Sequence, residues 1–243
     1  MKKALVPCLA SVLLMSASVT QAVEITYASA VAADGSGKTS LQTNNVFVET
    51  FDAPGGGPTM TANMVAISTV SGGGLAYGQG HLPGVYAAPA NDTTYFAYGP
   101  SAGSGANTSE VNFNYTGLLN SLGNGATLNY LGLYYGSIDM YNDLIFYNTV
   151  GAVIQTVTGA SLIAMFNGEP GNPNADSSNI YVNLFFTPEE EFTSFSFRTT
   201  AHAFEVDNLV VGYNVAPVPE PASLALLGLG LAGLGLARRR IGK

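Results

Sequence analysis

Between residues 45 and 214 the chain alternates short apolar, β-branched and aromatic runs with clusters of glycine, proline, asparagine and serine. A period of two residues is typical of half-buried strands, and no segment sustains the 3.6-residue period of an amphipathic helix. Turn-forming residues separate the runs, most clearly over 54–58, 71–74, 99–105 and 167–179. We expect strands within 45–51, 62–69, 94–98, 109–115, 127–135, 143–148, 152–158, 179–186, 192–199 and 203–214.

Roughly ten to twelve short strands with frequent turns predict an all-β fold, a β-sandwich of jelly-roll type. The 13 tyrosines and 12 phenylalanines supply apolar side chains for two inner faces. Residues 23–216 have a length that suits one large β domain rather than two. We therefore expect a single sandwich ectodomain over 23–216.

Positive charge, an apolar stretch and small residues follow one another at the N-terminus. Lys2 and Lys3 precede an apolar stretch from Ala4 to about Val19, and Thr20-Gln21-Ala22 follows. This order predicts a secretory signal peptide, residues 1–22, which signal peptidase removes after export by the general secretion machinery. Cys8 is the only cysteine and lies inside it, so the mature protein would have no disulfide.

Residues 217–243 combine prolines, an apolar run and a basic end. Proline neither continues a helix nor pairs in a central strand, so it separates this part from the domain before it. The apolar run 222–237 has sixteen residues; as a helix it would span about 24 Å, against about 30 Å for a hydrocarbon core. We expect a transmembrane helix that anchors the precursor in the inner membrane, extended by arginines that reach the interface. The arginines are Arg238, Arg239 and Arg240.

The order of Pro219-Glu220-Pro221, apolar run and basic end resembles the bacterial PEP-CTERM sorting signal. An exosortase, a polytopic membrane protease or transpeptidase, recognises that signal in bacteria that make extracellular polysaccharide. The resemblance implies that Pro219, Glu220 and Pro221 are recognition elements for an exosortase. It also implies that the processed protein reaches the cell surface or the extracellular matrix.

The middle of the chain carries a second resemblance. The segments Tyr130–Asp139, Tyr141–Tyr147 and Ala203–Val210 are similar to a family of exosortase-dependent surface proteins with a single sandwich domain. That family has no assigned reaction. The resemblance therefore implies a fold and a location, and we expect a role in exopolysaccharide, biofilm or floc structure.

The charge of the expected domain is one-sided, with Lys38 and Arg198 as its only basic residues against fifteen acidic ones. Two cations neutralise few phosphates, so nucleic acid is excluded as a partner. Cations and neutral polar polymers such as exopolysaccharide fit this surface better.

The closing segment Phe204–Asn208 resembles the last strand of several carbohydrate-binding jelly rolls. The resemblance implies that Asp207 ligates a structural Ca²⁺ together with acids near the first strand. Hard cations prefer several carboxylate and carbonyl oxygens. The candidate ligands are Glu49, Asp52, Glu205 and Asp207. The alternative is that these acids are solvated edge residues, or that Asp207 and Asn208 form a turn-side hydrogen bond.

Tyrosines in or beside loops are candidates for stacking on sugar rings in a lectin-like module. The chief candidates are Tyr134, Tyr135 and Tyr141, and the wider set adds Tyr77, Tyr86, Tyr95 and Tyr98. Tyrosine at alternating strand positions also packs in the core or across strands, which is the competing interpretation.

Catalytic chemistry has little support, and we expect no enzyme activity. His81 and His202 are the only histidines, and both are interpreted as structural or loop residues. The metalloprotease pattern H-E-x-x-H does not occur. A carboxylate-dependent glycoside hydrolase needs only two placed acids, and Asp139 and Asp143 are one pair that a turn could bring together. A passive matrix component, a lectin-like module and a hydrolase thus remain as alternatives, in that order.

Overall fold

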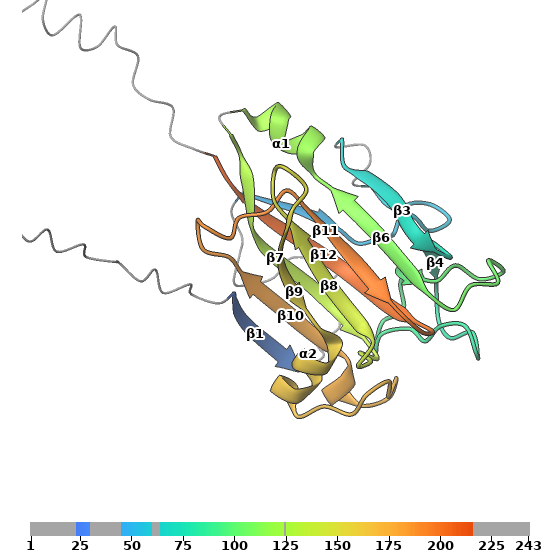
Figure 1. Cartoon of the computed structure of the whole chain (residues 1–243). Coiled ribbons are helices and arrows are strands. Elements are labelled where there is room, and N and C mark those ends of the chain that lie inside the picture. Colours follow the sequence, from blue (N-terminus) through green and yellow to red (C-terminus); the bar gives the residue numbers. More distant parts are fainter. Residues whose placement is uncertain (1–22, 30–44, 60–63, 124, 216–243) are drawn as a thin grey trace, which may run out of the picture.

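The computed structural model describes residues 23–29, 45–59, 64–123 and 125–215 (Figure 1). The expected signal peptide, the Pro219-Glu220-Pro221 motif and the expected transmembrane helix lie outside these ranges. In the described ranges, the helices are all too short or too polar to cross a bilayer.

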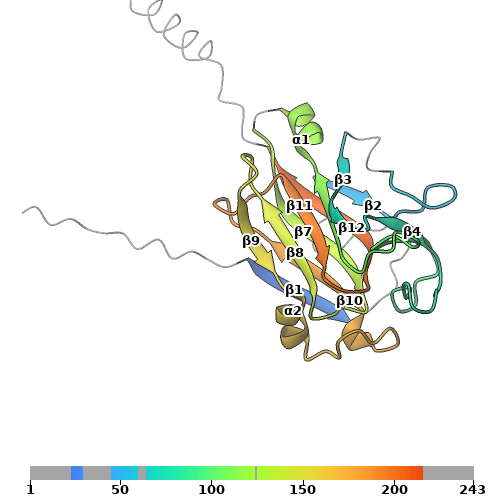
Figure 2. The ribbon, with the colours of Figure 1, turned by 45° about the vertical axis from the view of Figure 1, so that its right-hand side comes forward.

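Twelve antiparallel strands form two stacked sheets in the described part of the chain (Figures 1 and 2). The seven-stranded sheet has the order β1 (Glu24–Ser29), β10 (Ile180–Phe185), β7 (Thr127–Gly136), β12 (Phe204–Asn214), β5 (Phe96–Gly99) and β4 (Ala76–Gly78), and β2 (Val46–Glu49) also pairs with β12. The five-stranded sheet has the order β3 (Ala66–Gly72), β6 (Ser109–Asn114), β11 (Ser194–Thr199), β8 (Asn142–Tyr147) and β9 (Val153–Val157).

The prediction of an all-β sandwich is confirmed. Each of the ten runs expected to form a strand contains one, and from β6 onward the chain changes sheet at nearly every connection. β1 and β4 were not predicted from the sequence. β1 is a short strand directly after the expected signal peptide, and β4 has only three residues.

Aromatic side chains fill the space between the sheets. Phe195 on β11 stacks on Phe113 of β6 with ring centroids 5.3 Å apart, and Phe197 meets both rings edge-on. The seven-stranded sheet contributes aliphatic partners from its central strands. These are Leu131, Leu133, Val182, Leu184, Val206, Leu209 and Val211, all buried.

The closing strand β12 is buried on both faces over most of its length. Phe204 and Val206 face the core, which places Glu205 and Asp207 on the opposite, outer face. A bulge then interrupts the pairing with β7 between Asp207 and Val210, with Asn208 at φ 50°. The extra residue shifts the alternation by one, so Leu209 faces the core again.

Two short helices and one 3₁₀ turn, none predicted from the sequence, cover the ends of the sandwich. They are α1 (Thr116–Leu122), α2 (Gly159–Phe166) and η2 (Asp176–Ser178). Seven or eight residues are too few to show a helical period. Thr158 caps α2, since its Oγ1 accepts the Ser161 N–H at 3.1 Å.

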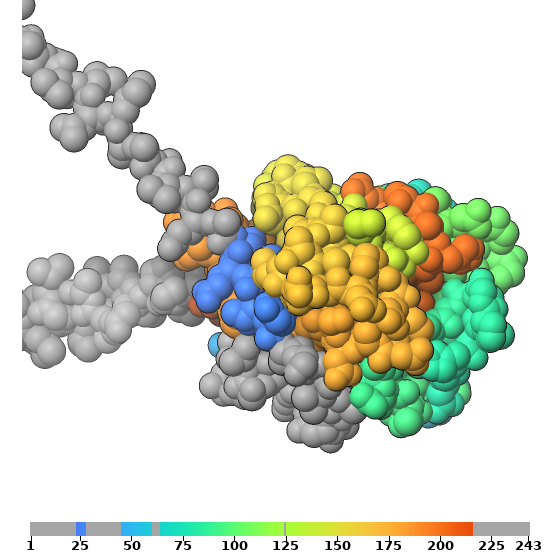
Figure 3. All heavy atoms as spheres, turned by 90° about the horizontal axis from the view of Figure 1, so that it is seen from below, coloured from blue at the N-terminus to red at the C-terminus, as the bar shows by residue number. Residues whose placement is uncertain are grey.

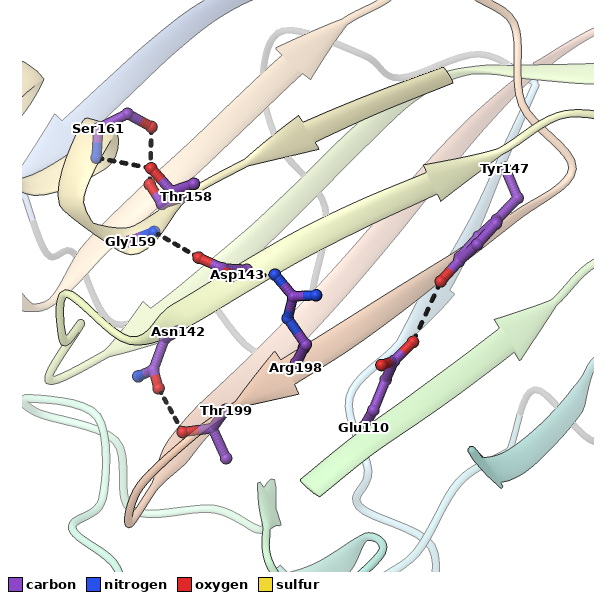
Figure 4. A network of polar contacts seen from close by, with 9 residues as sticks. All are labelled: Glu110, Asn142, Asp143, Tyr147, Thr158, Gly159, Ser161, Arg198 and Thr199. Carbon is purple, nitrogen blue, oxygen red and sulfur yellow. Dashed lines mark hydrogen bonds and ion pairs between the residues drawn. The ribbon is translucent and has the colours of Figure 1, made fainter. Parts of the chain in front are cut away.

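The outer face of the five-stranded sheet carries a polar network (Figure 4). Arg198 of β11 donates to Asp143 of β8 at 2.6 Å, and Asp143 also accepts the Gly159 N–H at the start of α2. Arg198 is the only lysine or arginine among the described residues. Both partners are partly exposed, so this pair contributes little to stability.

Replacing Phe195 with alanine should lower the free energy of unfolding by about 3 to 5 kcal/mol, because it leaves a cavity among stacked rings. Urea unfolding at constant slope measures this change. Val150→Ala is the matched control, since Val150 is 83% exposed; its effect should stay within about 0.5 kcal/mol. A loss below about 1 kcal/mol for Phe195→Ala would contradict the assigned core.

Candidate functional site

Two loops cover the outer face of the seven-stranded sheet where β12, β7 and β5 lie side by side. They are loop 79–95, between β4 and β5, and loop 167–179, between α2 and β10. Figure 3 shows them as adjoining surfaces, teal to green and orange. The Ala87 N–H donates to Glu205 Oε1 at 3.0 Å, and the Tyr134 hydroxyl donates to the Ala90 carbonyl. The cover is therefore bonded directly to the sheet.

Asn179 connects the two loops to the sheet. Its Oδ1 accepts the N–H groups of Ala90 and Ser137, both at 3.0 Å. Its Nδ2 donates to the carbonyls of Asn172 at 3.1 Å and Ala175 at 2.9 Å. Asn179 is fully buried, and its amide is satisfied by four backbone partners. This side chain fixes the position of loop 79–95 relative to loop 167–179.

An open cleft of about 460 Å³ lies between the loops and the end of β12. Two carboxyl groups, from Glu205 and Asp139, line it together with Tyr86 and both histidines. The remaining lining residues are Pro83, Gly84, Val85, Ala87, Ser137, Gly171, Pro173, Asn174 and Ala203.

Glu205 is 3% exposed at the base of this cleft. Ala87 donates to one carboxyl oxygen and the Ser137 hydroxyl donates to the other at 2.9 Å. Burial raises the pKa of Glu205 to about 7; these two hydrogen bonds oppose the rise, and the charge of Asp139 adds to it. Glu205 therefore changes its charge near neutral pH.

Asp139 occupies the wall of the cleft and is held by Tyr141. The Tyr141 hydroxyl lies 2.6 Å from Asp139 Oδ2 and 2.6 Å from the His202 carbonyl oxygen, so it donates its single proton to one at a time. Burial raises the pKa of Asp139, and the hydrogen bond from Tyr141 opposes this.

The histidine rings lie on the exposed rim. His81 Nδ1 accepts the Ala88 N–H at 3.2 Å, which places the proton of the neutral ring on Nε2. His202 Nε2 lies 3.1 Å from Asn107 Oδ1. His81 also lines a second cleft of about 490 Å³, together with Asp92, Asp176, Asn91 and others. The two clefts thus share a wall.

Asp207 lies under loop 79–95 and is 1% exposed. Its Oδ2 accepts the Asn208 side-chain N–H at 2.7 Å, and its carboxyl group lies within hydrogen-bonding reach of Asp92. Burial raises the pKa of Asp207 to about 9, and the nearby carboxylates of Asp92 and Asp52 add to this rise. Buried Asp207 and half-buried Asp92 of the loop therefore lie close together.

The four acids expected to bind calcium occupy separate positions. Glu49 accepts the N–H groups of Phe51 at 2.6 Å and Thr59 at 2.5 Å, whereas Glu205 faces the first cleft. Asp52 lies close enough to Asp207 for its charge to raise the pKa of Asp207. Within the described ranges no three histidine, cysteine, aspartate or glutamate side chains are grouped closely enough to hold a metal ion. The four-ligand set does not fit the fold, because Glu49 is engaged by its own turn.

The tyrosines expected to stack on sugars also take other positions. Tyr134 and Tyr135 are fully buried, so neither ring offers a face to a ligand. Tyr141 is partly exposed and positions Asp139. Tyr86, from the wider set, lines the first cleft and packs against Phe96 and Tyr98.

Asp139 and Asp143 do not form the carboxylate pair that their spacing suggested. Asp143 lies on the outer face of the five-stranded sheet with Arg198 (Figure 4). Asp139 instead lines the cleft beside the other sheet. The roles of Asn179, Ser137 and Asp92 were not predicted, because they depend on loop contacts between distant segments.

Residues 217–240 match the family model of the PEP-CTERM protein-sorting motif. The chain therefore carries this motif, and the identification made from Pro219, Glu220 and Pro221 is confirmed. The motif indicates an exported protein, a membrane-anchored precursor that an exosortase processes to the cell surface. The family model does not cover the sandwich domain.

No curated protein matches the chain. Among solved structures, the chain is similar to the enzymatically active domain of tailspike protein 4 from Bacteriophage CBA120, at 10% identity and a TM-score of 0.32. The match covers 62% of this chain and 19% of the tailspike chain. A likeness at this level carries no argument about fold or activity.

Replacing Glu205 with glutamine should remove a pH dependence of stability. The folded state keeps the Glu205 proton up to about pH 7, whereas the unfolded chain releases it near pH 4.5. Stability from this group is therefore full below pH 4.5 and is lost as pH rises through 7; the loss is about 3 kcal/mol.

Urea unfolding of both proteins from pH 4 to 8, in chelator, measures the difference. The difference in the free energy of unfolding between wild type and Glu205→Gln should change by about 3 kcal/mol across this range. For the exposed Glu189→Gln, the free energy of unfolding should change with pH as it does in wild type. Parallel curves for Glu205→Gln would show that the carboxyl group titrates normally.

Proposed function

We propose that this protein is a cell-surface or extracellular-matrix component that an exosortase processes and that contributes to exopolysaccharide, biofilm or floc structure. The match of residues 217–240 to the PEP-CTERM sorting motif carries the proposal. In this interpretation signal peptidase removes residues 1–22, and the C-terminal segment holds the precursor in the membrane until the exosortase acts.

The composition of the sandwich supports a structural role outside the cell. The chain has a formal net charge of −8, and its one cysteine lies in the expected signal peptide. Such a domain is hydrated, repels its own copies and needs no disulfide. It suits a matrix of neutral or cation-bridged polysaccharide.

Replacing Pro219, Glu220 and Pro221 together with alanine should block processing, because these residues form the recognition element. Intact mass and C-terminal peptide analysis of protein from the native host should show wild type without residues 238–243 and the variant with them, in the membrane fraction. Val215→Ala, just before the motif and on an exposed residue, is the control. Surface-located wild-type protein that still ends at Lys243 would overturn the proposal.

Saccharide binding in the first cleft is a second candidate function. Its volume of about 460 Å³ falls in the range of small-ligand sites. Glu205 and Asp139 offer acceptors to sugar hydroxyls, the His81 Nε2–H offers a donor, and Tyr86 offers an aromatic surface. Glu205 and Asp139 are already held by protein donors, so we infer binding rather than hydrolysis.

Asp139→Asn and Tyr86→Ala should each weaken retention of the mature protein on the host's exopolysaccharide by about tenfold, because each removes one ligand contact. Pull-down on that polymer measures this, with Glu110→Gln on the opposite sheet as the control. Equal retention of all variants would remove the cleft as a saccharide site and leave the matrix role in place. Release of reducing ends from the polymer would instead indicate hydrolysis.

A further inference from the structure

Two buried carboxyl oxygens beneath loop 79–95 have no hydrogen-bond donor among the described residues: Asp207 Oδ1 and Asp92 Oδ2. The other oxygen of each group is bonded. Asp207 Oδ2 accepts from Asn208, and Asp92 Oδ1 accepts the Thr94 N–H at 2.8 Å and the Thr94 hydroxyl at 2.7 Å. The two carboxyl groups themselves lie within hydrogen-bonding reach of each other.

Like charges at this separation repel strongly when water is excluded, so the pair needs a positive partner. Among the described residues, no lysine or arginine lies beside the pair. Arg198, the one lysine or arginine in the described ranges, is bound to Asp143 on the other sheet. The charge of Asp52 adds to the repulsion at Asp207. The neutral Tyr134 lies close to Asp92, Asp207 and Asp176 and brings no positive charge.

We propose that Asp92 and Asp207 bind a hard divalent cation, Ca²⁺, between loop 79–95 and strand β12. Both proposed ligands are carboxylate oxygens, which favour Ca²⁺ or Mg²⁺ over zinc or copper. Ca²⁺ fits better than Mg²⁺ because it accepts irregular geometry, whereas Mg²⁺ demands a near-ideal octahedron.

Two carboxylates make a site that water and neighbouring oxygens must complete. Asp52 Oδ1 accepts the Tyr95 N–H at 2.9 Å, which leaves its other oxygen to bind a metal-bound water or to add charge. Asp92 lines the second cleft, of about 490 Å³, which gives the cation a route from solvent. We expect the weak affinity of extracellular calcium modules, about 10⁻⁴ to 10⁻³ M.

This site differs from the one expected from the sequence, since it excludes Glu49 and Glu205 and includes Asp92. It is independent of saccharide binding, although the cation would hold loop 79–95, which also carries Tyr86 and His81. Occupancy would therefore order one wall of the first cleft.

Calcium titration of the mature protein tests the proposal by two readouts. Millimolar Ca²⁺ should raise the melting temperature over that in chelator. Tb³⁺ should give tyrosine-sensitised luminescence that Ca²⁺ displaces, because Tyr134 lies close to the site and the chain has no tryptophan.

Asp92→Asn and Asp207→Asn should each weaken Ca²⁺ binding at least about tenfold, whereas Asp176→Asn, which changes the same cleft without removing a ligand, should bind within about threefold of wild type. Asparagine keeps the size of aspartate, and melting in chelator reports whether each variant folds.

A shared proton would satisfy the same two oxygens. In that case wild type shows no Ca²⁺-dependent shift and no displaceable Tb³⁺ signal, and Asp207→Asn, which can donate to Asp92, is as stable as wild type in chelator. That result, or unchanged Ca²⁺ binding in both variants, overturns the proposal.

Discussion

Burial of strand β12 on both faces is the constraint on which the rest of the molecule depends. One face completes the aromatic core between the sheets, and the other carries Glu205 and Asp207. Acids on a central strand are stable only when something covers and bonds them, because an unpaired buried charge is costly. Loops 79–95 and 167–179 provide that cover, and both clefts lie where the cover is incomplete.

The cover is held by a few polar contacts and one small apolar cluster. A small cluster around Ala88, Phe96 and Tyr98 anchors one loop. Asn179 holds the other loop to it through backbone partners. A local opening of these loops would expose Glu205 and Asp207 to water without disturbing the stacked rings between the sheets. The functional surface and the stable part of the fold are therefore largely separate.

The sequence predicted the sandwich well, because period-two alternation directly reports which side of a strand faces a core. Glu205 and Asp207 were named as candidate ligands from the sequence, and both lie on the outer face of β12. The sequence could not predict their contact residues, because Ala87 and Asp92 lie more than a hundred residues away in a loop without hydrophobic periodicity. The tyrosines show the same limit. Alternation places Tyr134 and Tyr135 on opposite faces of β7, and Tyr135 lies in the core between the sheets. Only the contact with loop 79–95 shows that Tyr134 is buried as well.

The bulge at Asn208 shifts the inward and outward alternation of side chains by one residue between the two halves of β12. Before it, even-numbered residues face the core; after it, odd-numbered residues do. Without the extra residue, only one half of β12 could turn its apolar side chains to the core. The other half would place carboxylates against the aromatic rings, or leucine and valine under the loops. Deleting one residue here would therefore turn the side chains of one half of β12 to the opposite face. Asn208 adopts the left-handed conformation that the bulge requires, which lets both halves pair with β7 in one strand.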